Sequence, residues 1–394
     1  MKILVVNAGS TSLKFKLYEM PEGQVLAQCG IERVGSLDDG VFRFMNGLTG
    51  AGTELRNQCI PDYRAGIRQF LACLEGTEYG VIRDISEIER VGFKTTLSKG
   101  HPGVHELDEE TLQGMEDWIA MAPLHNRAYL NAIAVMREVL PEALFVGCFE
   151  TAFHQSIPAE RRVFGVPFEW VEKYGVRGLG YHGASHGYIA DVLNERLGPR
   201  YAAISCHLGG SCSVCAIEDG KSADISFGMS LESGLIHANR VGDIDSGMIW
   251  FLKDQGLTDD EIRSGFREKG GLLGISGVSN DLRYVMEAAK NGHYRSRLAI
   301  DVFVTGIVHY IGAFYLDLGR LDALVFTAGI GEHSPDIRRM VSERLLPLGV
   351  RLDPRKNETV PEDGIISEET SSCKVFVIPA DEEKGIARRT YDYR

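Results

Sequence analysis

The feature that most constrains this chain is a strand–loop–strand pattern that occurs twice. The first copy covers residues 3–17, where an apolar run ends at Asn7 and a small polar turn (8–12) leads into a second strand. The second copy has strands at 202–208 and 214–218 around a loop at 209–213. Each copy continues into a third strand, predicted at 25–31 and at 221–227, the latter after the strong hairpin signal Asp219-Gly220. One such loop alone would indicate an ordinary hairpin, but the whole repeated unit predicts an internally duplicated α/β protein.

The length of 394 residues is enough for two domains, each with its own core. Its 44% hydrophobic and 25% charged residues are typical of a soluble globular protein. The net charge of -13 argues against loose electrostatic binding to nucleic acid or to an anionic membrane. No stretch resembles a signal peptide or a membrane span, so the expected location is cytoplasmic.

The eight cysteines are scattered, mostly within apolar, strand-like segments. That distribution predicts buried, reduced thiols and no disulfide framework. Cys212 and Cys215 form a C-x-x-C, but in a strand this spacing places the two thiols on opposite faces. A metal or redox role for the pair is therefore not expected.

Helices and strands alternate between and after the two copies. Helices are predicted at 63–74, 108–120, 124–140, 258–269, 281–290 and 293–318, with further strands at 86–97, 143–148, 321–326 and 375–378. Residues 270–277 read as a glycine-rich connection, and 293–318 as a central buried helix. The repeat predicts domains at 1–150 with 384–394, and at 151–383.

Polar residues gather directly after predicted strands, where open α/β sheets bind ligands. Glycine-containing loops at 7–12, 207–213 and 329–333, together with nearby carboxylates, indicate nucleotide phosphate chemistry with Mg²⁺. The chain contains no Walker A motif, and Gly329-Ile330-Gly331 lacks the third glycine of a Rossmann fingerprint.

Nine segments together resemble the acetate kinase family of the sugar kinase and actin superfamily. They are NAGSTSLKF (7–15), MAPLHN (121–126), ETAFHQSIP (150–158), GYHGASH (180–186), CHLGGS (206–211), NRVGDID (239–245), GLLGISGVSNDLR (271–283), VFTAGIGEHS (325–334) and VIPADEEKGIAR (377–388). The resemblance implies two actin-like (ribonuclease H-like) domains of βββαβαβα topology, an ATP–Mg²⁺ site in the cleft between them, and a homodimer through the C-terminal domain. It also implies reversible transfer of a phosphoryl group from ATP to a short-chain carboxylate.

The resemblance assigns roles to individual residues. Glu150, His182 and Arg240 are implied to be catalytic, Asn7 and Glu382 to bind Mg²⁺ (or Mn²⁺), and Lys14 to contact ATP. The implied nucleotide-binding residues are His207, Leu208, Gly209, Gly210, Ser211, Asp281, Leu282, Arg283, Gly329, Ile330, Gly331, Glu332 and His333.

These residue types suit the chemistry, and each also has a purely structural interpretation. A carboxylate nucleophile is ionised at neutral pH, so the task is to stabilise charge on the transferring group, as Arg240 and His182 could do. Arg240 could instead pair with Asp243 or Asp245, and Glu382 could simply favour a helix start. His125 is open between a site residue and a core residue.

The chain departs from the family pattern at several positions. Lys94 stands where the family has the arginine that holds the substrate carboxylate, and Glu150 stands for an aspartate. We hypothesise that these two changes compensate each other. The phosphate loop reads His207-Leu-Gly-Gly-Ser211, and the segment before Arg240 is also altered.

The pocket for the acid is changed as well. Leu124 is kept, but Thr96, Tyr181 and Leu231 replace valine, phenylalanine and proline. Two added hydroxyls suggest a larger or more polar acid, and drift in an acetate kinase is the alternative. Further alternatives are a different phosphoryl donor and a catalytically weak nucleotide- or metabolite-binding protein.

Overall fold

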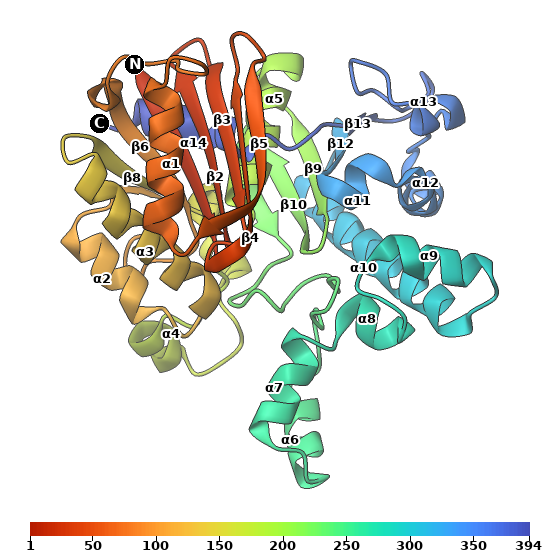
Figure 1. Ribbon diagram of the computed structural model, residues 1–394. Coiled ribbons are helices and arrows are strands. Elements are labelled where there is room, and N and C mark those ends of the chain that lie inside the picture. Colours follow the sequence, from red (N-terminus) through yellow and green to blue (C-terminus); the bar gives the residue numbers. More distant parts are fainter. The chain divides into compact units, whose positions relative to one another are not determined.

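The computed structural model describes residues 1–394, apart from the side chains of Pro123 and Leu124. The chain forms two compact units, residues 1–155 with 381–394, and residues 156–380 (Figure 1). Residues 151–155 and 381–383, predicted with the second domain, thus lie in the first unit. The helix that begins at Glu382 packs on the sheet of this unit.

The first unit is built on an eight-stranded sheet of order β5-β4-β3-β2-β1-β6-β8-β7. The strands are β1 (Lys2–Gly9), β2 (Ser12–Glu19), β3 (Gln24–Glu32), β4 (Ser36–Asn46), β5 (Gly52–Ile60), β6 (Ile88–Thr95), β7 (Val104–Glu106) and β8 (Leu144–Phe149). The helices are α1 (Tyr63–Glu75), α2 (Glu109–Asp117), α3 (Pro123–Val139) and α14 (Glu382–Asp392).

Neighbouring residues of β2 show that α1 and α14 cover opposite faces of this sheet. Phe15 stacks on Phe70 of α1, with ring centroids 4.4 Å apart. Lys16, which points to the other face, forms ion pairs with Asp381 (3.4 Å) and Glu383 (3.5 Å) at the start of α14. The apolar core lies on the face covered by α1 and α3.

The second unit is built on a five-stranded sheet of order β11-β10-β9-β12-β13. The strands are β9 (Ala202–Leu208), β10 (Cys212–Glu218), β11 (Lys221–Ile225), β12 (Ala323–Thr327) and β13 (Lys374–Val377). The helices are α4 (Phe168–Tyr174), α5 (Gly183–Leu197), α6 (Gly247–Asp254), α7 (Asp259–Arg267), α8 (Gly271–Ser276), α9 (Leu282–Lys290), α10 (Tyr294–Leu318), α11 (Ala328–His333), α12 (Pro335–Arg344) and α13 (Pro354–Glu358).

The two sheets confirm the predicted duplication. In each, three antiparallel strands (β1–β3 and β9–β11) are followed by two parallel strands on the other side of the first (β6 and β8, β12 and β13). The predicted hairpin at Asp219-Gly220 is present, and both residues have positive φ (48° and 77°), as a two-residue turn of the primed type requires. Strands β4, β5 and β7 extend only the first sheet.

Two predicted glycine-rich connections are instead helical. Residues 271–276 form α8, which packs on α10 although glycine disfavours helix. The glycine at position 271 is explained by a close approach, because a Cβ there would lie 2.1 Å from the carbonyl oxygen of His237 and 2.8 Å from that of Arg240. Residues 329–333, predicted as a loop, lie in α11, where Arg338 donates hydrogen bonds to the carbonyls of Gly331 and Glu332 (2.8 Å each).

Helix α10 differs from its sequence prediction in one respect. It is long and apolar enough to cross a membrane by length and composition, whereas no such segment was expected. Its residues Phe303, Val304 and Ile307 belong to the core of the second unit, however, as the prediction of a central helix required. All eight cysteines are free, and six of them, including Cys206 and Cys215, are buried as predicted, whereas Cys59 is exposed and Cys73 is partly buried.

Candidate active site

A cluster of charged residues lies at the end of the central strands of the first unit. Lys94 is on β6, and Glu150 follows the neighbouring parallel strand β8. The Lys94 Nζ atom lies 3.0 Å from Oε1 of Glu150 and 2.5 Å from Oε2 of Glu382, the first residue of α14. The side chains are only 20%, 10% and 18% exposed, respectively. The two predicted acids thus share one cation.

This arrangement shows what Lys94 can do. Burial by itself lowers the pKa of Lys94, but the carboxylates of Glu150 and Glu382 outweigh it, so the pKa lies well above its usual value. Lys94 is therefore an ammonium ion at every pH at which the protein would work. Its pairing with Glu150 is direct, which agrees with the hypothesis that these two replacements compensate each other.

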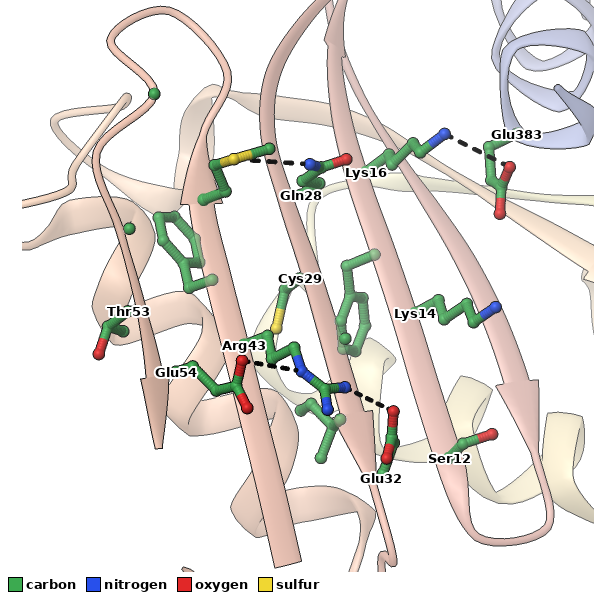
Figure 2. Close-up of a pocket in the computed structure, with 17 residues that line it drawn as sticks. Ser12, Lys14, Lys16, Gln28, Cys29, Glu32, Arg43, Thr53, Glu54 and Glu383 are labelled. Atoms are coloured by element: carbon green, nitrogen blue, oxygen red, sulfur yellow. Dashed lines mark hydrogen bonds and ion pairs between the residues drawn. The ribbon is translucent and has the colours of Figure 1, made fainter. Parts of the chain in front are cut away.

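Asn7 and Lys14 face each other across the β1–β2 pair next to this cluster. The hydroxyl of Tyr129 on α3 donates a hydrogen bond to Oδ1 of Asn7 (3.1 Å), and this orients the amide. Lys14 lines a cavity of about 750 Å³ over the open face of β2–β5 (Figure 2). Figure 2 shows Lys16 turned to Glu383, whereas no interaction is drawn for Lys14. Within the described part of the chain, its ammonium group forms no ion pair.

The oxygen atoms of this region suit a hard divalent cation. Asn7, Glu150 and Glu382 offer amide and carboxylate oxygens, the ligand types that Mg²⁺ takes. Among the described residues, however, no group of three or more acidic, histidine or cysteine side chains could hold a metal ion by itself. Donors of this type fit Mg²⁺, which commonly takes one or two protein carboxylates and keeps several waters.

His182, a predicted catalytic residue, is held in place by contacts within the second unit. It precedes α5 with φ 58°, a backbone conformation that is costly for a residue with a Cβ. Its Nδ1 atom lies 2.9 Å from Oγ of Ser213, and its ring stacks on that of His207 with centroids 4.0 Å apart. His207 in turn lies 2.8 Å from Oγ of Ser185 through Nδ1.

Arg240 is partly buried, and burial lowers its pKa although it stays a cation. Its Nη1 donates to the carbonyl of Leu231 (2.7 Å), the one hydrogen bond of its guanidinium within the described residues. Asp243 and Asp245 do not pair with it among these residues. They accept hydrogen bonds from the backbone N–H groups of Gly234 (2.7 Å) and Gly247 (2.8 Å) instead. Among the described residues, Arg240 therefore lacks the ion pair with Asp243 or Asp245 that was the structural alternative to a catalytic role.

Three predicted nucleotide segments surround one cavity of about 530 Å³ in the second unit. Its lining includes the predicted residues Gly209, Gly210, Asp281, Leu282, Arg283, Gly329, Ile330 and His333, and also Ala238, Asn280, Met286 and Ser334. Asp281 caps α9 and accepts from the guanidinium of Arg283 (2.5–3.1 Å), so it shapes the wall. The volume lies in the range of small-molecule sites.

Other predicted nucleotide residues do not line this cavity. The carbonyls of Gly331 and Glu332 accept from Arg338, and Oε1 of Glu332 accepts from the backbone N–H of Ala380 (3.1 Å). Leu208 is buried in the core. The buried Oγ of Ser211 makes no hydrogen bond to a described residue, as would suit a donor to phosphate.

The predicted acid-binding residues are divided between the two units. Thr96 is buried in the first unit, and the side chain of Leu124 lies outside the described residues. In the second unit, the buried Tyr181 donates its hydroxyl to the carbonyl of Met229 (2.7 Å). This added hydroxyl is thus engaged by the protein. His125 is exposed, so it is not a core residue.

Several contacting residues were not found from the sequence. Tyr129, Ser213 and His186 each touch a predicted site residue or its partner. A signal existed for two of them: His186 follows His182 by one helical turn, and Ser213 lies in the loop at 207–213 that the sequence indicated for phosphate binding. Tyr129 gave no signal, because an aromatic residue in an amphipathic helix is normally a core residue.

The duplicated sheet and a cavity lined by three glycine-containing segments are consistent with the actin-like class of phosphotransferases. A profile described as the acetokinase family matches residues 2–388. Acetate kinase of Bacillus subtilis (strain 168) is 40% identical over 98% of both chains, and that of Halothermothrix orenii is 39% identical over 99% of this chain and 98% of its own. The chain therefore belongs to the acetokinase family.

Solved structures agree with this assignment. The crystal structure of Porphyromonas gingivalis acetate kinase has a TM-score of 0.88 at 36% identity and covers 99% of this chain and 98% of its own. The structure of a propionate kinase from Francisella tularensis has a TM-score of 0.87 at 30% identity, with 100% coverage of both chains. The predicted family and fold class are thus confirmed.

Proposed function

We propose that this protein transfers the γ-phosphoryl group of ATP reversibly to a short-chain carboxylic acid, by direct in-line attack, and so forms an acyl phosphate. The observation that carries the proposal is the cavity of the second unit, where three predicted nucleotide segments far apart in sequence come together. Membership of the acetokinase family and the acetate and propionate kinase relatives support the same chemistry.

The side chains suit a reaction in which two anions must meet. The attacking carboxylate is ionised at neutral pH, so no general base is needed. Arg240, which has unused N–H groups within the described residues, is suited to hold the equatorial oxygens of the transferring group. His182 is suited to donate a hydrogen bond to the same group. Lys94, fixed between Glu150 and Glu382, supplies a cation of fixed position.

Mg²⁺ supplies charge neutralisation at the phosphates when it is bound. Asn7 and Glu382 are the residues that we propose to hold it, with Glu150 beside them. In this arrangement Lys94 keeps both carboxylates close together, and the Tyr129 hydroxyl keeps Oδ1 of Asn7 oriented.

The state of the Tyr181 hydroxyl favours acetate or a close apolar relative as the acid substrate. Because the Tyr181 hydroxyl already donates to the carbonyl of Met229, its proton is not offered to a polar substrate group. This supports the interpretation that the pocket residues have drifted in a kinase that still acts on acetate, over the interpretation that the substrate has become a polar acid.

A hydroxamate-trapping screen tests the function. Acetate, propionate, butyrate and lactate are each combined with ATP, GTP and pyrophosphate in the presence of Mg²⁺. We expect acyl hydroxamate with ATP and with apolar acids of two to four carbons. If no pair gives product while ATP still binds, the protein is a nucleotide-binding homologue without kinase activity, which is the rival function.

We further propose that the protein is a cytoplasmic homodimer that associates through the second unit. Tyr294, Leu298 and Val302 lie four residues apart on α10 and are exposed (74%, 39% and 37%), so they form one apolar stripe. The eight free cysteines suit a reducing compartment. Light scattering should show a dimer that Leu298→Glu with Val302→Glu converts to a folded monomer. A monomeric unmodified protein would refute this interface.

A further inference from the structure

Within the second unit, a chain of hydrogen bonds runs from His182 through three buried residues. Oγ of Ser213 lies 2.9 Å from Nδ1 of His182 and 2.7 Å from Nε2 of His186. The other ring nitrogen of His186, Nδ1, lies 3.0 Å from Oγ of Ser205. Ser205, Ser213 and His186 are all fully buried, so bulk water does not compete for these bonds.

The fold brings these residues together for simple geometric reasons. His207 and Ser213 are register partners on β9 and β10, so both point to the same face of the sheet. Ser205 is two residues before His207 on the same strand and shares this face. Helix α5 packs against this part of the sheet, and it carries His186 one turn after His182.

Each serine hydroxyl has one hydrogen and each neutral imidazole has one N–H, so a line in which Ser213 donates to one of its two imidazole neighbours can run in two directions. If Ser213 donates to Nδ1 of His182, it accepts from Nε2–H of His186. Nδ1 of His186 then accepts from Ser205. In this direction the proton of neutral His182 is on Nε2.

The opposite direction would place the His182 proton on Nδ1 and leave a lone pair on Nε2. A lone pair directed at phosphoryl oxygens is repulsive, whereas an N–H group there stabilises the developing negative charge. The tautomer of a histidine is set by the hydrogen bond that its other nitrogen makes. The direction of the whole buried line therefore decides whether His182 can take part in the reaction.

We propose that Ser213 is a positioning residue that holds His182 as the Nε2–H tautomer, with His186 and Ser205 fixing the direction of its hydroxyl. The network allows either direction, and the choice of the Nε2–H tautomer rests on the proposed function. The positive φ of His182 is consistent with a residue held in one orientation by its surroundings.

The tautomer can be measured without turnover. In ¹⁵N-histidine-labelled protein above pH 7.5, we expect the His182 resonances, assigned with His182→Gln, to show a protonated Nε2 and an unprotonated Nδ1. In Ser213→Ala we expect a mixture of both tautomers. A proton on Nδ1 in the unmodified protein, or an unchanged tautomer in Ser213→Ala, would overturn the proposal.

Kinetics provide the second readout. We expect Ser213→Ala to lower kcat by about 10- to 100-fold, with KM for ATP and for the acid changed less than about threefold. Ser213→Thr, which keeps the hydroxyl, should recover most of kcat. A loss in KM alone, or no recovery with threonine, would contradict a positioning role.

Ser296→Ala is the matched control. Ser296 is also fully buried, and its Oγ lies 2.8 Å from Nδ1 of His293 at the start of α10. Its removal therefore deletes a similar serine–histidine bond, but one without a link to His182. We expect a comparable fall in Tm with kcat unchanged, and an equal fall in kcat would show that the effect of Ser213→Ala is merely structural. If the unmodified protein makes no acyl phosphate, the proposed function fails while the tautomer measurement still decides this inference.

Discussion

Replacing Lys94 by methionine should destabilise the first unit by about 3 kcal/mol, because two carboxylates would lose the cation that they share. At the 3.0 Å that separates Nζ from Oε1 of Glu150, the Coulomb attraction is about 5–6 kcal/mol at an effective dielectric constant of about 20. The cost of desolvating the ions offsets part of it. We therefore expect a coupling energy of about 2 kcal/mol between Lys94 and Glu150 in a double-mutant cycle.

The cycle consists of Lys94→Met, Glu150→Gln and the double variant. Trp118 is the one tryptophan of the first unit, so urea unfolding is followed by its fluorescence after Trp170 and Trp250 are replaced by phenylalanine. We expect Glu150→Gln to cost clearly less in the Lys94→Met background, since it then removes repulsion from the neighbouring acid.

The exposed pair Arg64–Glu138 of the same unit is the control for this cycle. The two side chains are 40% and 54% exposed, so a coupling energy below about 1 kcal/mol is expected there. If the Lys94–Glu150 coupling is no larger than this, the reasoning that the cluster is held by its shared cation is wrong.

Two further predictions concern the second unit. Gly210→Val should weaken ATP binding, measured by calorimetry, at least about tenfold, because Gly210 lines the cavity. The fold should tolerate the substitution, since a Cβ at this position meets no atom within 4 Å. Gly165→Val, equally unobstructed but outside this lining, is the control, and an equal loss of affinity would refute the assignment of the cavity. His237 has a pKa lowered to about 3 by burial and by Arg240, and it accepts a hydrogen bond from the backbone N–H of Cys212. Between about pH 6.5 and 3 the His237 imidazole takes up a proton in the unfolded protein but not in the folded protein. The free energy of unfolding should therefore fall by up to about 1.4 kcal/mol per pH unit on acidification through this window, and His237→Gln should lessen the fall. Identical pH profiles for the two proteins would contradict this prediction.

Much of the fold could be predicted because its signals are local. Apolar runs ending in small polar turns identified both copies of the strand unit, and Asp219-Gly220 identified a hairpin that needs two residues of positive φ. The errors have a common cause. The glycines of α8 predicted a loop, but Gly271 is required by its close approach to the backbone at His237 and Arg240, and the helix packs on α10; both are contacts between segments apart in sequence.

The sequence by itself determined the duplicated α/β fold, the family and the identity of most candidate site residues, because these depend on residue patterns and motif order. Only the tertiary structure decided what each residue contacts. It showed that Lys94 is shared by Glu150 and Glu382, residues 232 positions apart in the chain, and that the Tyr181 hydroxyl is engaged by a backbone carbonyl. It also showed that Ser213 links His182 to His186. Ion pairs and hydrogen bonds depend on distances of a few ångströms across neighbouring strands and helices, and packing sets these distances.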